Sequence, residues 1–125
     1  MNRVRMIAFV ALAPVFAASA VVAQSQSAMN ATAAQNLRRA DQALNAQYTA
    51  TTGQLSAPSR TLLRDAQRAW ITFRDQQCRY ESSAVRGGSA FAMVQSDCLA
   101  RLTVERTREL RRLAQCEEGD LSCPR

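Results

Sequence analysis

The chain has 125 residues, enough for one small domain, and carries 16 basic and 10 acidic side chains for a net charge of +6. All the basic side chains are Arg, because the sequence contains neither His nor Lys. This excludes imidazole as a general base or metal ligand, and it excludes lysine Schiff-base chemistry. Arginine without lysine is typical of a protein encoded by a GC-rich bacterial genome.

Residues 1–23 have the pattern of a secretory signal peptide. Arg3 and Arg5 provide a positive start, a long apolar stretch follows, and small residues precede a cleavage site after Ala23. An uncleaved membrane anchor is the alternative, although a proline and many alanines make this stretch a poor membrane span. We therefore expect a periplasmic or secreted protein. Cleavage would leave 14 Arg against 10 acidic residues, a net charge of +4.

Residues 24–30 are small and polar, and we expect a short flexible tail there before a helical domain over residues 31–115. A first helix is predicted by apolar and small residues spaced three or four apart, namely Leu37, Ala40, Leu44, Tyr48, Thr51 and Leu55. Gly53 is placed to end this helix.

A second helix is predicted to begin at Ser56 or Ser59, with Pro58 in its first turn. Its inner face is expected to be Leu62, Ala66, Trp70, Phe73, Gln77, Tyr80 and Ala84. A third helix is expected after the Gly87–Gly88 turn, capped by Ser89, with an inner face of Phe91, Val94, Cys98, Leu102, Leu110 and Leu113. The fold class is therefore all-α, a three-helix up-down-up bundle.

The four cysteines predict how the helices are joined. Cys78 lies ten residues before Gly88 and Cys98 lies ten residues after it, so an antiparallel helical hairpin brings these two side by side. Cys116 and Cys123 are then left to close a short loop in the tail, residues 116–125. The spacing fits neither a zinc site nor a CxxC redox pair, and a disulfide framework implies an oxidising compartment.

The same hairpin register places Trp70 opposite Arg106 and Phe73 opposite Thr103. The turn between the first two helices places Asp41 beside Trp70 and within reach of Arg74. Trp70 is interpreted either as a core anchor or as a binding hot spot beside these charges. Asp75 belongs to the same candidate cluster and lies four residues before Arg79, the spacing of an ordinary helix ion pair.

Arginines crowd the third helix. They predict either a solvated face with local ion pairs or a site for an anionic lipid or glycan. The candidate residues for the anionic partner are Arg101, Arg108, Arg111 and Arg112.

Several short motifs together resemble a known family. They are Ala40-Asp41, Leu44-Asn45, Tyr48, Ala66-Gln67-Arg68-Ala69-Trp70, Arg74-Asp75, Cys78, Gly88-Ser89, Cys98, Leu102-Thr103, Arg106 and Leu110. In order and spacing the chain resembles the LprI-type lysozyme-inhibitor domain, a small helical domain of bacterial envelope proteins. The resemblance implies secretion, a helical fold, the Cys78–Cys98 bridge and inhibition of lysozyme, the enzyme that cuts peptidoglycan.

We therefore expect a non-catalytic binding protein of the bacterial envelope, with lysozyme as the leading partner. The alternatives are a module for an anionic envelope component and a structural partner of another periplasmic protein. We expect no metal, no cofactor and no nucleic-acid partner. Common animal lysozymes are strongly basic, so an inhibitor benefits from acidic groups, such as those of Glu117, Glu118 and Asp120.

Overall fold

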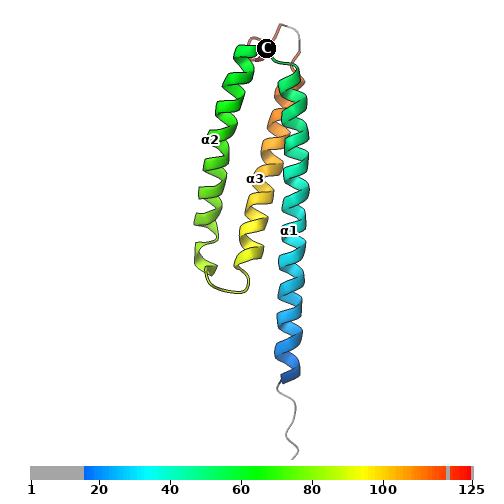
Figure 1. The fold of residues 1–125 in the computed structure, drawn as a ribbon, viewed down its shortest axis with the longest axis vertical. Coiled ribbons are helices and arrows are strands. Elements are labelled where there is room, and N and C mark those ends of the chain that lie inside the picture. Colours follow the sequence, from blue (N-terminus) through cyan, green and yellow to red (C-terminus); the bar gives the residue numbers. More distant parts are fainter. Residues whose placement is uncertain (1–15, 118, 125) are drawn as a thin grey trace, which may run out of the picture.

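The computed structural model describes residues 16–117 and 119–124, which form three long helices, one short 3-10 turn and no strand. The elements are α1 (Phe16–Gly53), α2 (Ala57–Glu81), η1 (Ser83–Val85) and α3 (Phe91–Ala114). They run up, down and up, so α1 and α3 are parallel neighbours (Figure 1). The expected all-α, up-down-up arrangement is confirmed. None of the helices in the described part of the chain is long and apolar enough to cross a membrane.

The start of α1 corrects one expectation. Residues 24–30 are helical and continue into the rest of α1, so a flexible tail is wrong for this segment. Its Gln, Ala and Met residues are good helix formers. Asn30 also ties it to the bundle, because its amide accepts from Gln26 at 3.0 Å and donates to the carbonyl of Ser89 at 3.0 Å. Residues 1–15 of the expected leader lie outside the described residues, and cleavage near Ala23 stays a prediction.

The closest packing in the molecule is between α1 and α3, which lie side by side (Figure 1). The buried side chains along this α1–α3 seam are small or medium in size: Ala33, Ala40, Leu44 and Thr51 on α1, and Thr103, Thr107 and Leu110 on α3. Small side chains allow two helix axes to approach closely. The Thr51 hydroxyl donates to the Gln47 carbonyl of its own helix at 2.9 Å and also contacts the Leu110 carbonyl of α3 at 3.4 Å. Three of the residues predicted for the first helix face are therefore in the core.

The second helix stands further from α1 than α3 does (Figure 1). It also turns a different face inward from the one expected. Leu62, Phe73 and Tyr80 were placed inside, yet they are 71%, 55% and 74% exposed. The buried residues of α2 are Gln67 and Cys78. Polar and covalent links to the other helices hold this face inward, and they outweigh the apolar stripe beside it.

Two of the three predicted helix ends, at Ser56 and Gly53, are confirmed. Ser56 is the N-cap of α2 and accepts from the backbone N–H of Ser59, with Pro58 in the first turn. Gly53 ends α1 as expected. The predicted cap at Ser89 is wrong, because Ala90 occupies the N-cap position of α3 and makes no side-chain cap bond. The Ser89 carbonyl instead accepts the Asn30 amide.

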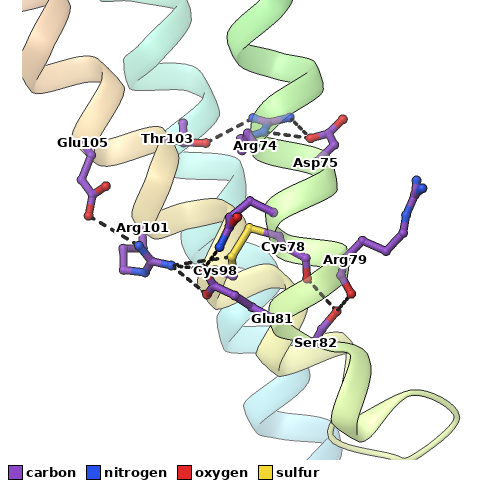
Figure 2. The surroundings of a disulfide bond; sticks show 11 residues. Arg74, Asp75, Cys78, Arg79, Glu81, Ser82, Cys98, Arg101, Thr103 and Glu105 are labelled. Atoms are coloured by element: carbon purple, nitrogen blue, oxygen red, sulfur yellow. Dashed lines mark hydrogen bonds and ion pairs between the residues drawn. A yellow bond between two sulfur atoms is a disulfide. The ribbon is translucent and has the colours of Figure 1, made fainter.

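Both predicted disulfides are confirmed. Cys78 and Cys98 join α2 to α3 with their Cα atoms 5.5 Å apart, as Figure 2 shows. Cys116 and Cys123 close the loop that follows α3, with Cα atoms 5.6 Å apart. Gly87 adopts φ +81°, which glycine tolerates best, so the chain turns at the predicted pivot.

Candidate functional site

The centre of the candidate site is Trp70, with a guanidinium group from each of two helices against its ring. The Cζ atom of Arg74, one turn along α2, lies 5.3 Å from the ring centroid. The Cζ atom of Arg106, from α3, lies 5.9 Å from it. Both distances are within the range of a cation–π interaction. The hairpin register therefore placed Trp70 and Arg106 correctly.

Arg74 links all three helices. Its guanidinium contacts Asp41 of α1 at 3.2 Å, Asp75 of α2 at 3.0 Å and the hydroxyl of Thr103 of α3 at 3.2 Å. Figure 2 shows the Asp75 and Thr103 contacts. Thr103 is fully buried, and it meets Arg74 where Phe73 had been expected. The Arg74 side chain is only 16% exposed.

Arg106 fixes the other side of the cluster. Its Nε donates to the amide oxygen of Gln67 at 2.9 Å, and its Nη1 donates to Glu109 at 2.6 Å. Gln67 is buried and Arg106 is 10% exposed, so this contact closes the space between α2 and α3. We call Asp41, Gln67, Trp70, Arg74, Asp75, Thr103, Arg106 and Glu109 the tryptophan cluster. Sequence reasoning missed Gln67, Thr103 and Glu109 as members of this cluster, although Glu109 lies three residues after Arg106.

The carboxylates of this cluster face outward while the guanidinium groups face inward. The side chains of Asp41, Asp75 and Glu109 are 44%, 50% and 45% exposed. Asp41 and Arg74 also border an open hollow of about 460 Å³ between α1 and α2, together with Asn45, Tyr48 and Arg68. Every buried side-chain nitrogen and oxygen of the described residues has a partner. The acidic groups of the cluster therefore remain accessible on a surface whose buried polar atoms are all hydrogen-bonded.

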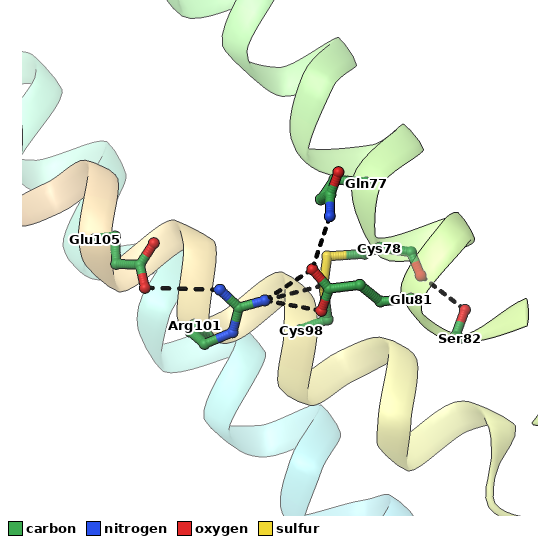
Figure 3. A network of polar contacts seen from close by, with 7 residues as sticks. All are labelled: Gln77, Cys78, Glu81, Ser82, Cys98, Arg101 and Glu105. Carbon is green, nitrogen blue, oxygen red and sulfur yellow. Dashed lines mark hydrogen bonds and ion pairs between the residues drawn. A yellow bond between two sulfur atoms is a disulfide. The ribbon is translucent and has the colours of Figure 1, made fainter.

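A second ionic network lies beside the disulfide (Figure 3), and its contact between α2 and α3 was not predicted. Arg101 of α3 contacts Glu81 of α2 at 2.8 Å and Glu105 at 3.7 Å. Gln77 donates to Glu81 at 2.9 Å. Hydrogen bonds from Gln77 and then from Arg101 lower the pKa of Glu81 below its ordinary value. The hairpin register could not have indicated this contact, because the register that pairs Cys78 with Cys98 places Glu81 opposite Gln95 rather than Arg101.

The proposed anionic-partner face of α3 is divided by these contacts. Arg101 is held by Glu81 and Glu105, and Arg111 donates to the Gln47 amide oxygen at 3.4 Å. Arg108 and Arg112 are exposed, and they lie one turn apart. Binding of an anionic lipid or glycan through this face stays a prediction that now depends mainly on these two side chains.

The loop closed by Cys116 and Cys123 carries the remaining acidic groups. Asp120 accepts from the hydroxyl of Ser122 at 2.7 Å and from its backbone N–H at 2.8 Å. These hydrogen bonds lower the pKa of Asp120 and keep it ionised, and the bond from the hydroxyl has the larger effect. Glu117 and the fully exposed Leu121 lie in the same loop, whereas Glu118 lies outside the described residues.

Comparison with known proteins places this geometry in context. The family model described as "Lysozyme inhibitor LprI" matches residues 17–110. A protein of Rhizobium meliloti (strain 1021), described as "Uncharacterized protein R02472", is 38% identical over 110 residues, which cover 78% of this chain and 79% of that protein. No solved structure matches the chain significantly.

Proposed function

The chain belongs to the LprI lysozyme-inhibitor family, and from this premise we propose that it is a secreted, non-catalytic protein that binds and inhibits lysozyme. The match covers most of α1, all of α2 and most of α3, and it ends before the disulfide-closed loop. We therefore place the inhibitory surface on the helices. The proposed location is the bacterial periplasm or the exterior, after removal of the leader.

The observation that carries this proposal is the outward row of carboxylates on the tryptophan cluster. Asp41, Asp75 and Glu109 are each held by an arginine that lies against Trp70. Side chains that are oriented before binding lose little rotamer entropy when a partner arrives. Their negative charge complements a basic enzyme, although the chain as a whole is basic.

The same contacts favour binding over catalysis. The carboxylate of each acidic residue in the cluster is occupied by a guanidinium group, an arrangement that suits electrostatic recognition of a partner. The four cysteines are all in disulfides and therefore provide no thiolate nucleophile.

A peptidoglycan-clearing assay with a basic animal lysozyme tests the proposal. Asp75→Asn should weaken inhibition about tenfold, the change expected when a desolvated charge pair worth about 1.4 kcal/mol is lost. Stability should change little, because Arg74 keeps Asp41 and Thr103. Asp97→Asn is the matched control, since Asp97 is also an exposed helical carboxylate but lies outside the cluster. Absence of inhibition by the wild type at a large molar excess, across several lysozyme types, would contradict the proposed function.

A further inference from the structure

One face of α2 is apolar and exposed and is not used by the bundle. It consists of residues spaced alternately four and three apart, namely Leu62, Ala66, Ala69, Phe73, Gln76 and Tyr80, and all six are exposed. We call them the outer stripe of α2. Alternating spacings of four and three are the repeat by which one helix packs along another in a coiled coil. The bundle itself buries a different face of α2, so the outer stripe has no partner helix among the described residues.

We propose that the outer stripe packs antiparallel against the outer stripe of a second copy of this chain. The two-fold axis lies at the level of Ile71, between Ala69 and Phe73. This arrangement places Leu62 on Tyr80 of the second copy and Ala69 on its Phe73, so that an aromatic ring meets a smaller side chain in both layers. Ala66 faces Gln76 between them. In a two-fold interface of this kind, each contact occurs twice, once on each side of the axis.

The charges beside the outer stripe complement each other in this register and in no parallel one. Asp65 and Arg79 flank the stripe on the same side, two heptad repeats apart, and both are exposed. Asp65 contacts Arg64 of its own chain at 2.9 Å, and antiparallel pairing brings its carboxylate to Arg79 of the other copy as well, which gives two ion pairs across the interface. Within one chain they are too far apart to interact, because helix neighbours lie three or four residues apart. The guanidinium group of Arg79 has no ion-pair partner in the described chain and extends away from the bundle (Figure 2).

An apolar hollow lies where Tyr80 of the second copy would arrive. Leu62 and Ala66 border this hollow of about 240 Å³ together with Leu55, Leu63 and Leu113. Tyr80 of the second copy packs over Leu62 at its mouth, where its ring is removed from water. The hollow and the outer stripe are thus parts of one apolar surface, and large surfaces of this type mark protein contacts.

Sedimentation velocity over a concentration series up to about 1 mM tests the proposal without any lysozyme present. The wild type should shift from monomer toward dimer as concentration rises. Phe73→Glu and Tyr80→Glu should each remain monomeric, with an unchanged helical circular dichroism spectrum. Leu121→Glu is the matched control, because Leu121 is fully exposed but lies in the C-terminal loop, and it should dimerise like the wild type. A wild type that stays monomeric throughout overturns the proposal.

A charge exchange tests the antiparallel register. Asp65→Arg and Arg79→Asp should each weaken the dimer about tenfold, because two ion pairs become two like-charge contacts. The double variant should restore the wild-type dimerisation constant to within about threefold. Arg68→Asp is the matched control: Arg68 is exposed on α2 but lies away from the stripe, and its loss should leave dimerisation unchanged. Failure of the double variant to recover would rule out this pairing.

Discussion

The two outer helices are attached to α3 in different ways. Between α1 and α3, the contact is a close-packed row of Ala, Thr and Leu side chains, and Leu110 near the C-terminal end of this row is fully buried. Between α2 and the other helices, the contact depends on a disulfide, the tryptophan cluster and the Glu81–Arg101 pair. Apolar burial thus builds a two-helix frame, while charged and covalent links position the third helix on it. This difference leaves an apolar face of α2 exposed and keeps acidic groups accessible.

The largest effect should come from a cavity in the α1–α3 seam. Leu110→Ala removes a fully buried side chain and should lower the free energy of unfolding by about 2–5 kcal/mol. Urea denaturation monitored by circular dichroism measures this loss. Leu121→Ala, at a fully exposed position, should change stability by less than about 0.5 kcal/mol. A small loss for Leu110→Ala would mean that the seam is not the main core.

A smaller but still clear loss should follow removal of the central arginine. Arg74→Ala leaves the buried hydroxyl of Thr103 and the Asp41 carboxylate without their guanidinium partner, and it should cost about 2 kcal/mol. Asp41→Ala should cost only about 1 kcal/mol, because Asp41 is 44% exposed and Arg74 retains Asp75. Urea denaturation of both variants and of an Arg79→Ala control checks the order. Equal losses for Arg74→Ala and Arg79→Ala would show that the cluster does not hold α2.

The Glu81 network should make a small part of the stability depend on pH. Because the pKa of Glu81 is lower in the folded chain than its ordinary value of 4.5, its contribution is complete above that value. It is lost as the pH falls through the lower folded-state pKa. Unfolding of the wild type and Glu81→Gln over a pH series should therefore differ at neutral pH and converge in acid. Curves that stay parallel down to low pH would contradict this role.

The smallest effect on inhibition is expected from the arginines at the far end of α3. Arg108→Glu combined with Arg112→Glu should leave lysozyme inhibition intact or slightly improve it, because repulsion from a basic enzyme decreases. Clearing assays at two salt concentrations measure this. Binding to anionic vesicles, if it occurs through this face, should instead fall in the double variant and with added salt. Loss of inhibition in the double variant would transfer the inhibitory surface to this face.

Much of this architecture follows from turn positions and cysteine spacing. The glycine turn predicted the Cys78–Cys98 bridge and the meeting of Trp70 with Arg106, because an antiparallel hairpin has one pivot. The face of α2 could not be chosen in this way. Leu62, Phe73 and Tyr80 form a stripe with helical spacing, but so do the neighbouring Gln67, Trp70, Arg74 and Cys78.

The choice between these two stripes depends on long-range partners. Thr103 and Asp41 hold Arg74, Arg106 holds Gln67, and Cys98 holds Cys78. Hydrophobic periodicity contains no information about such contacts. Residues 24–30 were misjudged for a related reason: they lack an apolar stripe but have adequate helix propensity, and Asn30 finds a partner in Ser89 far along the chain.

Amide hydrogen exchange of the oxidised chain and of a Cys78→Ala, Cys98→Ala variant tests the central distinction most directly. The bridge should contribute about 2–5 kcal/mol, and its removal should speed exchange mainly in α2. The α1–α3 seam, from Ala33 to Leu110, should keep most of its protection, because its core does not depend on the bridge. Equal loss of protection in all three helices would contradict the account, since it would show one cooperative core rather than a two-helix frame that carries α2.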